Sequence, residues 1–365
     1  MAIRVIISGG GTGGHIFPAV AIANALKKIA PDTEILFVGA NGRMEMEKVP
    51  IAGYKIIGLD IQGFQRKSLL KNVLLPYKLL KSVIKARSII KNFKPDIAVG
   101  VGGYASGPLL YAANQMGVPY LIQEQNSFAG ITNKILGKNA KLICVAFEGM
   151  DKFFPANKIK ITGNPIRPEV VNIENKRFEA SELLSISAHK KTILLTGGSL
   201  GSGTLNKSML RGLDKIIASD VQVIWQTGKY YHHAVMEQLK GKEHPNIKVL
   251  EFLHRMDLAY AAADLVISRA GAGTIAELCV VKKAAILVPS PNVAEDHQTK
   301  NALALVERDA ALMLSDQVAE FELIDMALTL LKDKDKCRNL SENISRLALP
   351  DADEKIAVEV IRIAN

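Results

Sequence analysis

Residues 264–277 read DLVISRAGAGTIAE, and this stretch decides how the rest of the sequence is interpreted. It predicts a buried strand over residues 264–268, a glycine turn at Gly271 and Gly273, and a helix after Thr274. The first N–H groups of a helix carry a partial positive charge and favour a phosphate. Glu277, about one turn into that helix, would accept hydrogen bonds from ribose hydroxyls. We therefore predict a nucleotide site, with a simple capping motif as the alternative.

The next strand of the sequence supports this prediction. Residues 284–289 (AAILVP) form another apolar run, followed by a loop with proline and asparagine and then by residues 295–302 (EDHQTKNA). Ligands of parallel sheets bind outside the carboxyl ends of the strands. Polar groups after both strands would therefore face the same ligand.

Short apolar strands alternate with helices along most of the 365 residues. The N-terminal series has predicted strands at residues 3–8, 34–38, 96–100, 119–122 and 141–145 and a helix at 17–28; a second series opens at residue 191. We predict an α/β fold with two Rossmann-like domains that face a central cleft. Pro165 and Pro168 mark a linker. The predicted domains are residues 1–164, with a final helix at 349–365 docking back, and residues 165–348.

The net charge of +10 is concentrated in one segment, residues 66–94, which holds nine lysine and arginine residues and no acidic residue. A nucleic-acid-binding face would spread basic residues among aromatics, so we expect no nucleic acid. Residues 69–75 form an apolar cluster beside lysines and predict contact with an anionic membrane surface. The helical stripe that follows is expected to pack on the sheet; it comprises Leu79, Val83, Ala86, Ile90 and Phe93.

The sequence shows no pattern typical of a secreted, a membrane-spanning or a metal-binding protein. It shows no signal peptide pattern and no apolar stretch of about 18 residues, the length that a membrane-spanning helix needs. Cys144, Cys279 and Cys337 share no metal-ligand spacing, and no Asp-x-Asp motif follows a strand at the glycine-rich edges. We expect no metal and no cofactor.

Two glycine loops follow strands of the N-terminal series. Residues 9–14 (GGGTGG) formally contain G-x-G-x-x-G, but the strand at residues 34–38 leads into Gly39, Ala40 and Asn41 rather than a ribose-binding acid. Close approach of the backbone to a substrate phosphate is the remaining explanation. Residues 100–107 (GVGGYASG) form the second loop, and together the loops predict a diphosphate cradle. His15 follows the first loop as a candidate general base, with a helix cap or a packing residue as the alternative.

A polar segment follows the next strand. Residues 123–127 read QEQNS, and their amides and the Glu124 carboxylate could bind the hydroxyls and acetamido group of a sugar. An exposed polar loop is the alternative.

Taken together, these motifs make the sequence similar to glycosyltransferase family 28, and within it to the UDP-N-acetylglucosamine transferases that form lipid II. The similarity spans essentially the whole chain and rests on residues 10–15, 102–107, 124–126, 129–134, 162–167, 197–201, 226–228 and 268–277. It implies a GT-B fold, no cofactor, and a protein bound peripherally to the cytoplasmic side of the inner membrane. It also implies an inverting transfer of N-acetylglucosamine from UDP-GlcNAc to lipid I.

The resemblance assigns residues to three parts of a site. Contacts to the sugar donor map onto Thr12, Gly13, Gly14, Asn126, Arg167, Ser199, Leu253, Ala272, Gly273, Thr274, Ile275, Ala276, Glu277 and Gln298. The acceptor maps onto Gly11, Gly102, Gly103 and Tyr104, and the catalytic candidates are His15 and Glu124. Many relatives carry histidine where this chain has Gln123, which leaves His15 as the better candidate base.

Three other functions fit parts of the sequence. A related lipid glycosyltransferase could add glucose or galactose to diacylglycerol. A sugar-nucleotide 2-epimerase would need neither a lipid nor the basic segment. A non-catalytic scaffold at the membrane would have no use for the glycine loops or Glu277.

Overall fold

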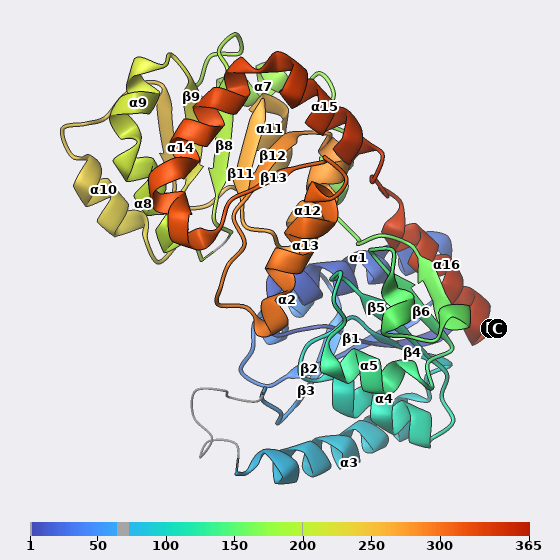
Figure 1. Ribbon diagram of the computed structural model, residues 1–365. Helices are drawn as coiled ribbons and strands as arrows, with labels where there is room; N and C mark the ends of the chain where they lie inside the picture. Colours follow the sequence, from blue (N-terminus) through green and yellow to red (C-terminus); the bar gives the residue numbers. More distant parts are fainter. Residues whose placement is uncertain (1, 64–72, 199) are drawn as a thin grey trace. The chain divides into compact units, whose positions relative to one another are not determined.

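The computed structural model describes residues 2–63, 73–198 and 200–365 (Figure 1). The chain divides into two compact units, one formed by Met1–Ile166 with Leu349–Asn365 and the other by Arg167–Ala348. The boundary between Ile166 and Arg167 falls within the predicted linker between Pro165 and Pro168. No described helix combines the length and the apolar character needed to cross a membrane.

The first unit contains a parallel sheet in the order β3-β2-β1-β4-β5-β6-β7. Its strands are β1 (Arg4–Ser8), β2 (Glu34–Ala40), β3 (Lys55–Leu59), β4 (Ile97–Gly100), β5 (Tyr120–Glu124), β6 (Leu142–Val145) and β7 (Ile159–Ile161). Its α-helices are α1 (Gly13–Ile29), α2 (Glu45–Ile51), α3 (Leu75–Phe93), α4 (Ser106–Gln115), α5 (Ile131–Gly137) and α16 (Ala352–Ala364). The strand order reverses between β1 and β4, so the loops after these two strands meet at one edge.

The second unit repeats this plan in the order β10-β9-β8-β11-β12-β13. The strands are β8 (Thr192–Thr196), β9 (Gln222–Gln226), β10 (Ile247–Leu250), β11 (Leu265–Ser268), β12 (Ala284–Leu287) and β13 (Leu312–Met313). The helices are α6 (Pro168–Val171), α7 (Arg177–Leu184), α8 (Gly203–Arg211), α9 (Leu213–Ala218), α10 (His232–Leu239), α11 (Met256–Ala262), α12 (Ala272–Val281), α13 (His297–Val306), α14 (Asp316–Lys332) and α15 (Lys334–Ser345). Here the order reverses between β8 and β11, where Ser268 pairs with Thr196.

Apolar side chains cover both faces of each sheet, as the near-continuous apolar strands predict. In the first unit, α1 and α16 share a buried cluster with one face, and α3, α4 and α5 share another cluster. Figure 1 shows α16, at the end of the chain, beside α1. Ile356 and Val360 of α16 are fully buried, and Lys28 of α1 pairs with Glu354 at 2.7 Å.

Some sequence-based predictions of elements were wrong in detail. The first helix begins at Gly13 rather than residue 17, so the glycines form its first turn and Pro18 lies inside it. Strands β3, β7, β9, β10 and β13 were not predicted. The first three residues of β3 are not fully buried, so it is not one of the strands buried along their whole length. In α3, Val83, Ala86 and Ile90 are buried as predicted, but Leu79 is exposed.

Candidate functional site

The turn predicted at Gly271 and Gly273 lies between β11 and α12. Helix α12 begins at Ala272 with Gly271 as its N-cap, so it starts before Thr274 rather than after it. Thr274 lies in the first turn and is not the cap that the alternative capping motif requires. The first intrahelical bond runs from the N–H of Ile275 to the carbonyl of Gly271 at 3.0 Å. The N–H groups of Gly273 and Thr274 precede it and therefore lack an acceptor within the helix. A Cβ atom at Gly273 would meet no atom within 4 Å, so the space beside it is open.

Glu277 lies in α12 and is almost fully buried, but it does not lack partners. Arg167 forms a two-pronged ion pair with it, from Nε to Oε1 at 2.7 Å and from a terminal nitrogen to Oε2 at 2.6 Å. The hydroxyl of Tyr260 donates to Oε2 at 3.0 Å. Three hydrogen bonds leave a carboxylate room to accept roughly one more. The structure thus brings together Arg167 and Glu277, which were both predicted to contact the sugar donor. It adds Tyr260, which the sequence did not indicate.

Electrostatics within this group keep its hydrogen bonds in place. Burial raises the pKa of Tyr260 well above its usual range, and the charge of Glu277 acts in the same direction. The phenol therefore stays protonated and donates. Burial lowers the pKa of Arg167, but the hydrogen bond and charge of Glu277 outweigh this effect and raise the pKa above its ordinary value.

Of the other residues predicted to contact the sugar donor, Thr12, Gly13, Gly14 and Asn126 belong to the first unit, and the rest lie in loops and helices of the second unit. Gln298 lies in the first turn of α13. Its Oε1 accepts from the N–H of Ser290 at 2.8 Å, which ties the loop after β12 to that helix. Leu253 and Ile275 are buried, whereas Ala276 is only partly buried. Ser199 lies outside the described residues.

Arg269 is a further residue of this unit that the sequence analysis missed. One terminal nitrogen donates to the carbonyls of Val288 and Pro289 and to the carboxylate of Asp316, and the other donates to the hydroxyl of Ser202. These bonds join the segments that follow β8, β11 and β12. Arg269 therefore positions the loops around the start of α12.

The glycine loops of the first unit touch backbone to backbone. The N–H of Gly10 donates to the carbonyl of Gly102 at 3.2 Å. A Cβ atom at Gly103 would lie 2.4 Å from the carbonyl oxygen of Gly10, and Gly103 has a φ of +93°, so no other residue fits there without strain. Ser106 at the start of α4 donates to the carbonyls of Ser8 and Gly102, both at 2.9 Å. The structure thus joins the two predicted loops into one backbone surface.

A buried carboxylate that the sequence did not reveal supports this surface. Glu45, at the start of α2, is fully buried. Its Oε2 accepts from the N–H of Gly11 at 2.8 Å, and its Oε1 accepts from the N–H of Ala40 at 3.0 Å. Gly10 has no room for a Cβ atom because the Glu45 carboxylate occupies that space. Glu45 therefore links the end of β2 to the first glycine loop.

We expect Glu45→Ala to displace the glycine loop and lower kcat/KM for the acceptor by about tenfold or more. Loss of charge-assisted hydrogen bonds costs roughly 1.5 to 3 kcal/mol. Steady-state kinetics in both substrates checks this prediction, and Glu45→Gln should restore part of the activity because one amide oxygen can still accept. Glu47→Ala, on the exposed part of α2, is the control. Equal losses in Glu45→Ala for donor and acceptor would contradict a specific effect on the acceptor loop.

His15 lies in the first turn of α1, against the second glycine loop. Its Nδ1 is 3.2 Å from the hydroxyl of Thr12. A Cβ atom at Gly102 would lie 2.3 Å from Cδ2 and 2.7 Å from Nε2 of the ring, so the imidazole rests on this glycine. The ring is partly exposed, while Thr12 and Gly14 are exposed. The structure thus places an imidazole at the surface formed by the two loops.

Glu124 is buried at the end of β5, and its carboxylate accepts hydrogen bonds from the segment that follows this strand. Its Oε1 accepts from the N–H and the side-chain amide of Asn126 at 3.1 and 3.4 Å. Its Oε2 accepts from the N–H of Gly130 at 3.2 Å and the amide of Asn133 at 2.8 Å. Burial raises the pKa of Glu124, and these hydrogen bonds oppose the shift. Gln123 is also buried and donates to Asn164 at 2.8 Å.

Within the described residues, no three His, Cys, Asp or Glu side chains come together in a way that could hold a metal ion. None of the three cysteines forms a disulfide, and Cys144 and Cys279 are buried. Burial raises the pKa of both of these thiols to about 12, so they stay protonated at neutral pH.

Comparison with known proteins identifies the family. The N-terminal domain of glycosyltransferase family 28 matches residues 5–145, and the C-terminal domain of that family matches residues 192–356. These matches and the two parallel sheets define a two-domain GT-B glycosyltransferase, which confirms the predicted fold class. The chain belongs to glycosyltransferase family 28.

Curated relatives share most of the sequence. A Bacteroides fragilis protein named UDP-N-acetylglucosamine--N-acetylmuramyl-(pentapeptide) pyrophosphoryl-undecaprenol N-acetylglucosamine transferase is 59% identical over all of this chain and 96% of its own length. A Parabacteroides distasonis protein of the same name is 58% identical over 99% of this chain and 98% of its own.

Solved structures agree with this assignment. MurG of Acinetobacter baumannii matches with a TM-score of 0.80 and 29% identity over 99% of both chains. A UDP-N-acetylglucosamine 2-epimerase matches with a TM-score of 0.67 but only 15% identity, over 99% of this chain and 95% of the other, and so shares the fold alone.

Proposed function

We propose that the protein transfers N-acetylglucosamine from UDP-GlcNAc to the 4-hydroxyl of the N-acetylmuramyl sugar of lipid I, forming lipid II for peptidoglycan. The observation that carries this proposal is the 59% identity over the whole chain to a relative named for that transfer. Members of this family act as glycosyltransferases, and the same relative's name contains both the sugar donor and the pyrophosphoryl-undecaprenol acceptor. An identity this high over the full length of the chain supports the same pair of substrates here.

The residues divide between the two substrates. The open N-terminus of α12, Arg167 and Glu277 would bind the diphosphate and ribose of the sugar donor. The joined glycine loops of the first unit would hold the acceptor's diphosphate through backbone N–H groups, with Gly11, Gly102 and Gly103 at their surface. Asn126, whose loop Glu124 fixes, would contact the transferred sugar. Glu124 then acts as a positioning residue, because four hydrogen bonds already occupy its oxygens.

The proposed chemistry is a single displacement with inversion. The acceptor hydroxyl attacks the anomeric carbon of N-acetylglucosamine, the bond from that carbon to the diphosphate breaks, and UDP leaves with the bonding electrons. His15 accepts the hydroxyl proton as general base. The helix end and Arg167 stabilise the charge that develops on the diphosphate.

The test is incubation of the purified protein with radiolabelled UDP-GlcNAc and a soluble lipid I analogue. We expect a labelled disaccharide product and release of UDP. Labelled product with diacylglycerol instead would favour the related lipid glycosyltransferase. Conversion of UDP-GlcNAc to its 2-epimer without an acceptor would favour the epimerase, and the absence of any turnover would favour a scaffold.

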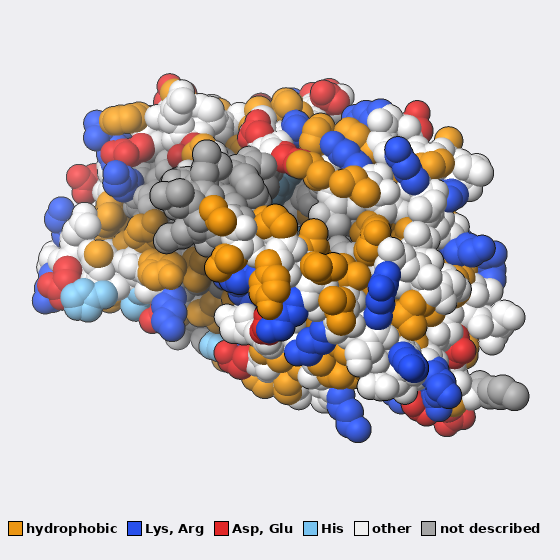
Figure 2. Space-filling view, turned by 90° about the horizontal axis from the view of Figure 1, so that it is seen from below, with side chains coloured by type: hydrophobic (Ala, Val, Ile, Leu, Met, Phe, Trp, Pro, Cys, Tyr) orange, Lys and Arg blue, Asp and Glu red, His pale blue; other side chains and the backbone are white. Residues whose placement is uncertain are grey.

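We further propose that the protein binds peripherally to the cytoplasmic face of the inner membrane. The predicted apolar cluster at residues 69–75 lies largely outside the described residues. Helix α3 supplies a described candidate, because Tyr77, Leu80 and Ile84 are 65%, 61% and 57% exposed and share one helical face. Figure 2, seen from the side on which α3 lies in Figure 1, shows hydrophobic side chains interspersed with Lys and Arg. This pattern suits an anionic bilayer surface.

We expect the triple substitution Lys78→Gln, Lys81→Gln and Lys91→Gln to weaken binding to anionic vesicles. Each lysine near such a surface contributes about 1 kcal/mol, so three amount to roughly a hundredfold in partitioning. Co-sedimentation at low and high salt measures this, and high salt should release the wild-type protein. Removal of Lys242, Lys332 and Lys334, exposed in the second unit, is the control of equal charge. Identical partitioning of the two triple variants would show that α3 does not contact the bilayer.

A further inference from the structure

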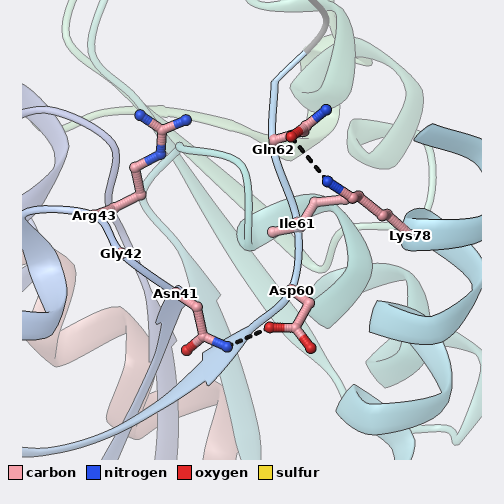
Figure 3. Close-up of a pocket in the computed structure, with 7 residues that line it drawn as sticks. All are labelled: Asn41, Gly42, Arg43, Asp60, Ile61, Gln62 and Lys78. Atoms are coloured by element: carbon pink, nitrogen blue, oxygen red, sulfur yellow. Dashed lines mark hydrogen bonds between the residues drawn. The ribbon is translucent and has the colours of Figure 1, made fainter. Parts of the chain in front are cut away.

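A pocket of about 320 Å³ lies beside the glycine loops and has no role in the site described above (Figure 3). Its walls come from three segments that are separate in sequence. Asn41, Gly42 and Arg43 follow β2, Asp60, Ile61 and Gln62 follow β3, and Lys78 comes from α3. The pocket thus occupies the carboxyl edge of the parallel sheet, where ligands of this fold class bind.

The pocket has polar groups of both charges. Asn41 donates to the carboxylate of Asp60 at 2.5 Å, and Lys78 donates to the amide oxygen of Gln62 at 3.0 Å. The hydrogen bond from Asn41 lowers the pKa of Asp60, and nearby lysines also lower it, so this carboxylate is ionised at neutral pH. In Figure 3 Arg43 and the Gln62–Lys78 pair lie toward one end of the pocket and the Asn41–Asp60 pair toward the other.

Arg43 is the group in this pocket most available to a ligand. No described carboxylate lies within ion-pair distance of its guanidinium, which lies over the ring of Tyr104 at 5.6 Å from the ring centroid. An arginine held over an aromatic ring keeps its hydrogen-bond donors free for a planar anion such as a carboxylate. The exposed position of Arg43 leaves that anion room to approach.

Two contacts connect the pocket to the glycine loops. The ring of Tyr104 lies 3.7 Å from the position of a Cβ atom at Gly11, so the residue that supports Arg43 also touches the first loop. Glu45, two residues after Arg43, accepts from the N–H of Gly11. A ligand whose diphosphate rests on the loops can therefore extend a second part into the pocket.

We propose that this pocket binds the peptide portion of the acceptor, with Arg43 pairing with a peptide carboxylate. The proposal rests on the proposed function, since the relatives' name gives the acceptor a pentapeptide. A peptide offers carboxylates to Arg43 and amide N–H groups to Asp60. A second diphosphate site is less favourable because the Asp60 carboxylate would repel a phosphate with two charges. Arg43 is thus a specificity residue for the acceptor rather than a catalytic residue.

The experiment compares two short-chain, soluble lipid I analogues, one with the pentapeptide and one with the lactyl carboxyl group capped as a methylamide. We expect Arg43→Gln to raise KM about tenfold or more for the pentapeptide acceptor and to leave KM for the capped acceptor and for UDP-GlcNAc nearly unchanged. Arg43→Lys should lie in between. Lys55→Gln, at the opposite end of β3, is the control for removal of one positive charge.

Each outcome decides the proposal. An equal rise in KM for both acceptors would place Arg43 on the diphosphate, and unchanged KM for both would leave the pocket without a role in substrate binding; either result overturns the proposal. If the wild-type protein glycosylates neither acceptor, the proposed function fails. Fluorescence polarisation with the labelled pentapeptide analogue then tests the pocket separately, and equal affinities of wild type and Arg43→Gln would overturn it.

Discussion

His15→Ala is expected to lower kcat by roughly 10² to 10⁴, the usual contribution of a positioned general base, while KM for UDP-GlcNAc changes little. The reason lies in the placement of the imidazole, which rests on Gly102 of one glycine loop and contacts Thr12 at the end of the other. A base at this position is close to an acceptor held by both loops. His15 is not itself one of the residues predicted to contact the sugar donor, so its loss should leave most of the donor binding intact.

The pH dependence of kcat provides a second readout. A general base acts only in its unprotonated form, so the wild-type rate should fall on the acid side as the base becomes protonated. His15→Ala should lose this acid limb together with the rate. His233→Ala, an exposed histidine of α10, is the matched control and should keep both. A His15→Ala variant with near-normal kcat and an unchanged pH profile would return His15 to the role of a packing residue at the start of α1.

The sequence was sufficient to predict the strands and loops that a local run of apolar residues or glycines marks. Apolar runs of four to seven residues marked β1, β2, β4, β5 and β6 to within two residues, because strands buried on both faces need continuous apolar side chains. Glycine runs after β1 and β4 marked the two loops, because only glycine allows the backbone of Gly103 to approach Gly10. In these places the local pattern and the tertiary structure impose the same requirement.

The sequence could not reveal partners that meet only in the folded chain. Glu45 reads as an ordinary acidic residue in the first turn of a helix, and nothing local indicates that its carboxylate accepts from Gly11, 34 residues away. Arg269 lies inside the stretch that decided the fold, yet its partner Asp316 is 47 residues further along. Tyr260 reads as one more apolar residue of α11. The supporting residues of a site are therefore harder to predict than the residues at its surface.

The pairing of Glu277 with Arg167 also changes what loss of Glu277 should do. From the sequence alone, Glu277 is an acceptor for ribose, and its removal would weaken binding of any uridine nucleotide. In the structure the same carboxylate holds Arg167 through two hydrogen bonds, so its removal also releases the side chain proposed to contact the diphosphate. The two roles predict different responses to ligands with and without phosphates.

We expect Glu277→Ala to weaken binding of both UDP and uridine by about ten- to a hundredfold, since a charge-assisted hydrogen bond contributes roughly 1.5 to 3 kcal/mol. Arg167→Ala should weaken binding of UDP by a similar factor but leave uridine nearly unchanged. Titration calorimetry with the two ligands measures both effects, and circular dichroism establishes that the variants are folded, a necessary control because Glu277 is buried. Tyr260→Phe removes one hydrogen bond to Glu277 and should cause a smaller loss for both ligands. If Glu277→Ala lost affinity for UDP but bound uridine normally, Glu277 would serve only to position Arg167, and the ribose would have to be bound by another residue of the second unit.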